Sequence, residues 1–271
     1  LLKYKMQGFL LSIQSEFYKT RKTLAFLSAI LLPLILCILI TAGFYTHADK
    51  IMFLSAKMQW FRFTGAFLGV MGSLILPILI IFQTFSVNNI EHRAEMWKSL
   101  FSLPIPKWSI YSAKYVYVVF LNALCLALFA SFIIVSGYLL NVLNPELKFN
   151  QFDISGILFK LHLKLFLASL GILSIQFLFS LLWADFLKPM GIGFVLTVFG
   201  IITANLGWKY AFTIPYTHPM LALQSMMKQV LNNKNEQMEF DLMSQEIYVS
   251  FIVAAITFII GYFVINKRSI R

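Results

Sequence analysis

Residues 23–45 read TLAFLSAILLPLILCILITAGFY, a run of 23 residues that contains no charged side chain. An α-helix needs about 20 mostly apolar residues to cross the hydrocarbon core of a bilayer, so this run is long enough to span a membrane. It exceeds the roughly 7–15 apolar residues of a signal-peptide core, and no small-residue cleavage site follows it. We therefore predict that residues 23–45 form a retained first membrane span.

Five more runs of similar length and composition follow along the chain. None contains Asp, Glu, Lys, Arg or His, and each is about twice as long as the alternating ten-residue segments of a transmembrane β-barrel. The chain is 59% hydrophobic and 12% charged, whereas a soluble domain carries about 25% charged residues. The sequence predicts an all-α polytopic membrane protein with six transmembrane helices. The predicted spans cover residues 23–45, 63–86, 115–140, 165–184, 190–208 and 247–265.

Basic residues predict the orientation of the chain. With both termini in the cytoplasm, 13 of the 22 Lys and Arg residues lie on the cytoplasmic side, which agrees with the positive-inside bias of membrane proteins. We therefore expect a multi-pass protein of the cell membrane, with residues 1–22 as a cytoplasmic helix, 23–265 as the membrane domain and 266–271 as a cytoplasmic tail. The net charge of +11 suits anionic membrane lipid, and no nucleic-acid-binding motif is present.

The segment before the first span is amphipathic. Met6, Leu10, Ile13 and Phe17 recur at the spacing of one helix face, and Glu16 lies away from that face. One interpretation is a helix that rests in the lipid headgroups. The other is a helix that also braces a cytoplasmic partner.

The loop between the second and third spans is strongly patterned. Residues 88–107 read NNIEHRAEMWKSLFSLPIPK, in which Asn88 or Asn89 can cap a helix and Glu91 lies in its first turn, where a carboxylate suits the helix dipole. Pro104 and Pro106 end the helix. This pattern predicts a short cytoplasmic helix, and it leaves open whether the helix rests on lipid or docks in a protein.

Prolines and glycines mark kinks and close packing within the spans. Pro33 and Pro77 lie inside the first and second spans, where each removes a helix hydrogen bond and predicts a kink. Gly65 and Gly69 form a single GxxxG motif, whose expected role is ordinary packing within the chain.

The outer loop before the last span contains a second helical pattern. Residues 214–221 read IPYTHPML, and Pro219 suits the first turn of a new helix. We predict a short amphipathic or re-entrant helix at the outer leaflet. His218 is expected to be a cap or turn residue, because no second His or acidic residue stands at metal-ligand spacing, and no metal site is predicted.

What the sequence lacks narrows the function. The centres of the predicted spans hold no ionisable residue, which argues against a proton-coupled pump or an intramembrane protease. The chain has no GxxxxGK[ST] phosphate loop, so it is not expected to hydrolyse ATP, and no catalytic residues are predicted. Three hypotheses remain: a transport subunit powered by another protein, a membrane enzyme or carrier with its site in the loops, and a membrane assembly factor. The patterned cytoplasmic helix favours the first.

Several segments together resemble the permease subunit of an ABC-2 type ABC transporter. They are residues 15–22 (SEFYKTRK), residues 91–100 (EHRAEMWKSL) with 103–107 (LPIPK) and on to Lys114, residues 215–219 (PYTHP), and the tail 266–270 (NKRSI). The chain is similar to the small six-span members associated with lantibiotic or bacteriocin immunity and peptide export.

The resemblance implies an exporter in which two permeases, identical or homologous, bind cytoplasmic ATPase subunits that hold ATP and Mg²⁺. No cofactor is expected in this chain itself. Peptides, lipids and other amphipathic molecules are all candidate substrates. The resemblance also implies roles for three groups of residues. The coupling helix that contacts the ATPase would contain Glu91, Arg93, Glu95, Met96, Trp97, Lys98 and Leu100. The connecting helix would contain Glu16, Phe17, Lys19 and Arg21. The outer re-entrant segment would contain Pro215, His218 and Pro219.

Overall fold

The computed structural model describes residues 2–93, 100, 102, 104–232 and 241–267, and every regular element in those residues is helical. Six of the described helices are long and apolar enough to cross a membrane. The prediction of an all-α protein with six spans is therefore confirmed. The spanning helices are α2 (Leu24–Thr46), the continuous run α3–η2–α4 (Ala56–Arg93), α6 (Lys107–Leu143), α7 (Ser155–Leu182), α8 (Leu187–Asn205) and α10 (Gln245–Lys267).

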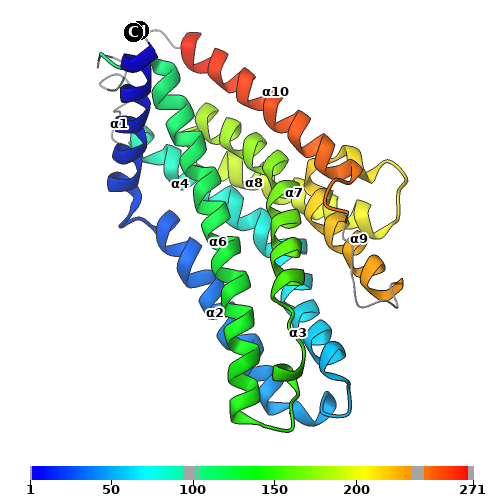
Figure 1. Cartoon of the computed structure of the whole chain (residues 1–271). Helices are drawn as coiled ribbons and strands as arrows, with labels where there is room; N and C mark the ends of the chain where they lie inside the picture. Colours follow the sequence, from blue (N-terminus) through cyan, green and yellow to red (C-terminus); the bar gives the residue numbers. More distant parts are fainter. Residues whose placement is uncertain (1, 94–99, 101, 103, 233–240, 268–271) are drawn as a thin grey trace.

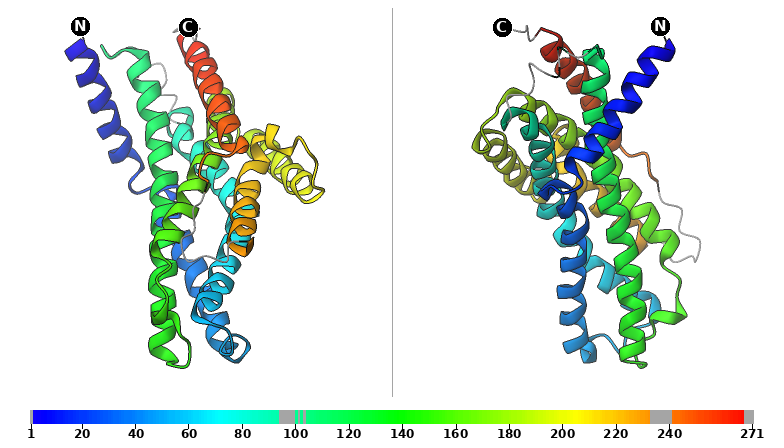
Figure 2. Two further views of the ribbon diagram at one scale, coloured as in Figure 1. Left: turned by 45° about the vertical axis from the view of Figure 1, so that its right-hand side comes forward. Right: turned by 90° about the vertical axis from the view of Figure 1, so that its left-hand side faces the viewer.

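The remaining elements lie before and between these spans. They are α1 (Leu2–Thr20), the 3₁₀ turns η1 (Ala48–Lys50), η3 (Phe149–Gln151), η4 (Ala211–Thr213) and η5 (Pro215–Thr217), and α9 (His218–Asn232). Figures 1 and 2 show the start of α1 and the end of α10 at the same end of the molecule, which we call the terminal end. The connections after α2 and after α6, residues 47–55 and 144–154, lie at the opposite end, which we call the loop end.

Large apolar side chains remain exposed along the outward faces of the spans. In α2 these include Leu31, Ile35 and Leu39, and in α10 they include Ile252 and Ile256. A soluble monomer rarely exposes apolar patches of such extent, whereas a lipid-facing surface consists of them. The helices thus pack through one face and present the other to hydrocarbon.

The second span is interrupted by a π-helical turn, η2 (Met71–Ile75), between α3 (Ala56–Val70) and α4 (Leu76–Arg93). The Leu76 N–H donates to the Met71 carbonyl, a bond five residues back. Pro77 has no N–H to continue the α-helical ladder, which accounts for an irregular turn at this place. Within this turn Gly72 lies against Leu223 of α9, since a Cβ at Gly72 would be 2.1 Å from the Leu223 Cδ1 atom.

One residue of the GxxxG motif, Gly69, does not pack within the chain as the sequence predicted. Gly69 is exposed, and a Cβ added there would meet no atom of the described residues within 4 Å. The expectation that Gly69 serves packing within the chain is therefore wrong, because this face of α3 points away from the bundle. Gly65 is half-buried, and Pro33 is buried inside α2.

The segment before the last span folds back onto the bundle. Pro215 begins η5, and His218 is fully buried, with its Nε2 atom 2.8 Å from the Phe212 carbonyl oxygen. Burial lowers the pKa of His218 to about 4, so the ring is neutral at pH 7, and we assign the Nε2 hydrogen as the donor to this carbonyl. Pro219 follows within the first turn of α9, whose N-terminal part packs on α7 and η2.

A buried lysine joins this segment to two spans. Lys164 of α7 is fully buried, and its ammonium group donates to the Ser225 hydroxyl of α9 and to the Asp241 carbonyl, each at 3.0 Å. The same nitrogen lies 3.7 Å from the Glu246 carboxylate at the start of α10. These contacts tie α7, α9 and α10 together.

The closest backbone approach of the segment is at Gly200 of α8. A Cβ built on Gly200 would lie 2.6 Å from the Tyr216 carbonyl oxygen of η5, whereas a Cβ on Gly191 of the same helix would meet no atom of the described residues within 4 Å. Backbone cannot rotate away as a side chain can, so η5 must shift if Gly200 is enlarged.

We predict opposite effects of alanine at these two glycines. Gly200→Ala lowers the free energy of unfolding by about 1–3 kcal/mol through overpacking, whereas Gly191→Ala raises it by up to about 1 kcal/mol through helix propensity. Thermal unfolding of both variants in the same detergent checks this. Equal effects of the two substitutions would contradict the close contact between α8 and η5.

Candidate functional site

The face of α1 that packs on the bundle consists of small and polar residues. Gly8, Ser12, Glu16 and Thr20 recur every fourth residue and are all buried. The predicted apolar face of the same helix lies outward, with 55% of Leu10 and 41% of Phe17 exposed. Small side chains allow two helices to approach closely, so the polar stripe, rather than the apolar one, forms the contact with α6.

Both ends of this stripe meet α6 or the residues just before it. At one end a Cβ on Gly8 would be 3.5 Å from the Ile105 side chain and 3.7 Å from the Ser109 hydroxyl. At the other end the Thr20 hydroxyl forms a hydrogen bond with the Tyr117 hydroxyl of α6. The two helices therefore run side by side in the same direction, as Figure 1 also shows.

Two carboxylates and two ammonium groups form a closed ring between three helices, which we call the charge ring (Glu16, Lys19, Glu91 and Lys114). Lys19 of α1 lies 3.0 Å from one oxygen of Glu16 and 3.0 Å from one oxygen of Glu91. Lys114 of α6 lies 2.9 Å from the other oxygen of Glu16 and 2.6 Å from the other oxygen of Glu91. Each carboxylate thus bridges both lysines, and positive and negative charges alternate around the ring.

The charge ring is buried. The side chains of Glu91 and Lys114 are fully inaccessible, 3% of Glu16 is exposed and 21% of Lys19 is exposed. Lys114 also donates a hydrogen bond to the Val87 carbonyl of α4, at 3.3 Å, so the ring also holds the backbone of that helix. Because two negative and two positive charges cancel, the cluster carries no net charge into the interior.

The electrostatics of Lys19 follow from this arrangement. Burial lowers the pKa of Lys19, but the carboxylates of Glu16 and Glu91 raise it by more, and the resulting pKa lies above the ordinary value of 10.5. The ammonium group therefore stays charged at pH 7. Buried charges are costly unless they are paired with good geometry, and here every member of the ring has two partners of opposite charge.

The charge ring lies close to Leu100, one of the residues predicted for the coupling helix. Leu100 and Ile105 line a cavity of about 70 Å³ together with Glu16 and Lys19 of α1. Glu91 belongs to the last turn of α4, and Arg93 at its end is exposed. His92 contacts the Ser180 carbonyl oxygen of α7 through its Nε2 atom, at 3.1 Å. Glu95, Met96, Trp97 and Lys98 lie outside the described residues.

The other candidates on α1 lie on its outer side. The guanidinium group of Arg21 stacks over the Tyr18 ring, 5.0 Å from its centroid. Phe17 meets Phe26 of α2 edge to face, with the ring centroids 6.1 Å apart. These contacts hold the junction between α1 and the first span, but they do not belong to the charge ring.

Sequence reasoning singled out Glu16, Lys19 and Glu91 separately and did not predict that they meet. Lys114 was missed as a site residue, although it directly precedes the third span. The sequence does contain a signal for this contact. Small and polar residues recur at every fourth position, and such a stripe predicts a close contact with another helix. They are Gly8, Ser12, Glu16 and Thr20. The residues of the stripe do not show which helix lies on the other side of that contact.

We predict that the losses of stability caused by single substitutions in the charge ring do not add. Lys114→Met leaves the buried Glu91 and Glu16 with one ammonium partner between them, and we expect a loss of about 3–5 kcal/mol in the free energy of unfolding. The double variant Glu91→Gln/Lys114→Met leaves the neutral Glu16–Lys19 pair, and its loss should be smaller than the sum of the two single losses by at least about 1 kcal/mol.

Denaturant or thermal unfolding of the detergent-solubilised variants measures these values. Lys148→Met, at an exposed lysine of the loop end, is the control and should change stability by less than about 0.5 kcal/mol. Strict additivity of the two ring substitutions would show that the charges do not interact.

Comparison with known proteins gives the family of the chain. A family model described as ABC-2 family transporter protein matches residues 12–200. No curated protein and no solved structure matches the chain. The matched region begins within α1 and ends within α8, so it contains all four members of the charge ring. With a family match over more than half of its length and six helices able to span a bilayer, this chain belongs to the ABC-2 family of transporter proteins and is a multi-pass membrane component of that family.

Proposed function

We propose that this chain is the permease subunit of an ATP-driven exporter, which moves a peptide, lipid or other amphipathic molecule out of the cell with energy from a separate ATPase. The observation that carries the proposal is the charge ring, which lies beside Leu100 and Ile105, within a chain of the ABC-2 family. A transmission element must connect a surface that contacts the ATPase with helices that cross the membrane, and the charge ring connects α1, α4 and α6.

The ring supports a specific route for this transmission. A displacement of the segment after α4 pulls on Glu91, and both lysines of the ring are bonded to that carboxylate. Because Lys19 belongs to α1 and Lys114 to α6, the displacement reaches the leader helix and the third span at once. Buried ion pairs resist separation, since parting them exposes an uncompensated charge to the interior. The three helices are therefore expected to move as one body.

The partners in this proposal are a cytoplasmic ABC ATPase, which binds ATP and Mg²⁺, and a second permease, identical or homologous. The substrate leaves between the two permeases. The exposed Gly69 face of α3 supports the second permease, because small residues on an unpacked helix face allow another helix to approach. The similarity to small immunity permeases makes an antimicrobial peptide a candidate substrate.

The first prediction from this proposal concerns orientation in the cell membrane. Cys37 and Cys125 are buried and free, and both are replaced by Ala. A single cysteine is then placed at Ser55 of the loop end or at Gln14 of α1, both of which are exposed. Ser55→Cys should react with a membrane-impermeant maleimide in intact cells, and Gln14→Cys should react only after permeabilisation. The reverse pattern would place the termini outside the cell and would contradict the proposed orientation of the chain in the membrane.

The second prediction separates docking from transmission. Trp97→Ala should reduce co-purification of the cognate ATPase by roughly thirtyfold in affinity, because aromatic anchors at interfaces contribute about 2 kcal/mol. Glu91→Gln/Lys114→Gln should keep the ATPase bound but should abolish the dependence of its hydrolysis on substrate in reconstituted membranes, since the ring no longer joins the three helices.

Glu146→Gln, at an exposed carboxylate of the loop end, is the control and should leave both readouts unchanged. Full recovery of the ATPase with Trp97→Ala would remove the coupling-helix assignment. Normal substrate-dependent hydrolysis in the ring variant would remove the transmission role of the charge ring.

A further inference from the structure

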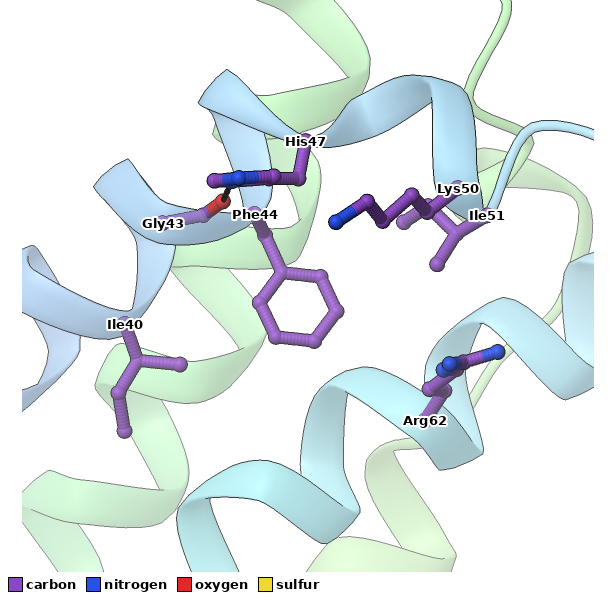
Figure 3. Close-up of a pocket in the computed structure, with 7 residues that line it drawn as sticks. All are labelled: Ile40, Gly43, Phe44, His47, Lys50, Ile51 and Arg62. Carbon is purple, nitrogen blue, oxygen red and sulfur yellow. Dashed lines mark hydrogen bonds between the residues drawn. The ribbon is translucent and has the colours of Figure 1, made fainter.

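A cavity of about 370 Å³ opens at the loop end, between the last turns of α2, the η1 turn and α3. Its lining residues are Ile40, Gly43, Phe44, His47, Lys50, Ile51 and Arg62 (Figure 3). In Figure 3 the Lys50 side chain extends toward His47 and the Phe44 ring, and Arg62 approaches from α3. The volume lies within the range of about 300–1,000 Å³ that is usual for ligand pockets.

The polar side of this cavity is cationic. Lys50, Arg62 and His47 are its only titratable side chains among the described residues, and no Asp or Glu lines it. In the part of the chain that the structure describes, neither Lys50 nor Arg62 forms an ion pair. The His47 Nδ1 atom lies 3.1 Å from the Gly43 carbonyl oxygen, which fixes the ring at the cavity wall. Two cationic side chains with no acidic partner among the described residues thus share one recess.

The floor of the cavity is apolar and firmly packed. Phe44 meets Phe63 of α3 edge to face, with the ring centroids 5.0 Å apart, and Ile51 is buried. Ile40 extends the apolar surface along α2. A ligand that fits both parts must therefore carry a negative charge at one end and hydrocarbon at the other.

The place of the cavity along α2 indicates where such a ligand comes from. Leu31, Ile35 and Leu39 are exposed on α2, as is typical of a lipid-facing helix. The apolar run ends at Tyr45, and His47, Asp49 and Lys50 follow within five residues. The cavity therefore lies where the hydrocarbon of a bilayer gives way to its headgroups, which is also the depth at which lipid phosphates lie.

We propose that this cavity binds the phosphate headgroup of an anionic lipid. Lys50 and Arg62 contact the phosphate, and the part of the acyl chain next to the headgroup packs over Phe44 and Ile40. Arg presents a planar fork of donors that matches a phosphate, and Lys adds a point charge. The assignment holds independently of the ATPase and of the transported substrate, because it concerns only the loop end of the permease.

The experiment uses the delipidated full chain in a neutral detergent, with lipid binding measured by native mass spectrometry. Phosphatidylglycerol should bind at least about tenfold more tightly than zwitterionic phosphatidylcholine, and this preference should be lost in Lys50→Ala/Arg62→Ala. The matched control, Lys57→Ala/Lys148→Ala, removes two positive charges from the same end outside the cavity and should keep the preference. An equal loss of the phosphatidylglycerol preference in both double variants would show general attraction between charges and would overturn the assignment of the site to this cavity.

A second pair of variants tests the cavity without touching its charges. Within the part of the chain that the structure describes, a Cβ on Gly43 meets no atom within 4 Å. Gly43→Leu therefore fills space at the cavity wall and should weaken phosphatidylglycerol binding by about tenfold or more. Gly191→Leu, at an equally open glycine of α8, should leave binding unchanged. Unaltered binding in Gly43→Leu would place the lipid elsewhere.

Inorganic phosphate distinguishes a free anion from a lipid headgroup. We expect millimolar phosphate to compete weakly, because it lacks the hydrocarbon that covers Phe44. Competition by phosphate at the same concentration as phosphatidylglycerol would show a simple anion site and would overturn the lipid assignment.

Discussion

Four buried charges at the terminal end hold together helices that come from three distant parts of the chain. Glu16 and Lys19 lie on α1, Glu91 lies in the last turn of α4, and Lys114 lies near the start of α6. Removal of any one of these groups leaves three charges that no longer balance in the interior, and this penalty is larger than the gain from most surface contacts. The position of the leader helix, the end of the second span and the start of the third are therefore fixed together.

The charge ring also explains why α1 packs through its polar side. A helix at a membrane surface normally turns its apolar face to lipid, and Leu10 and Phe17 remain outward here. Glu16 and Thr20 then face α6, where Glu16 forms an ion pair with Lys114 and Thr20 a hydrogen bond with Tyr117. The polar face of α1 thus packs on the bundle, and its apolar face remains exposed at the edge of the helices.

The loop end is built on a different principle. It relies on aromatic packing, in which the Trp60 indole N–H donates to the Phe149 carbonyl at 2.8 Å and its ring meets both Phe63 and Phe149. The charges there lie on the rim: Lys50 and Arg62 are exposed above the cavity floor. The charge ring is thus buried and neutral at the terminal end, whereas Lys50 and Arg62 are exposed and form no ion pair with the described residues at the loop end. This contrast agrees with a role in helix coupling at the terminal end and with ligand binding at the loop end.

The structural class of this protein could be predicted from its sequence, because the length and composition of an apolar run are local properties. The six spans, the proline at the irregular turn near Pro77 and the family resemblance could all be found from residues close together in the chain. Glu16, Lys19 and Glu91 could be singled out as candidates on the same basis.

Only the tertiary structure decided which charges meet. Glu91 and Lys114 are 23 positions apart and Glu16 lies 98 positions before Lys114, so no periodic pattern connects them. The tertiary structure also places Gly69 on an outward face and Lys50 and Arg62 in one cavity. At Gly200 it brings the backbone of η5 close to α8. The physical reason is the same in each case. A helical pattern shows that a face exists, but the partner of that face depends on how the helices pack around it.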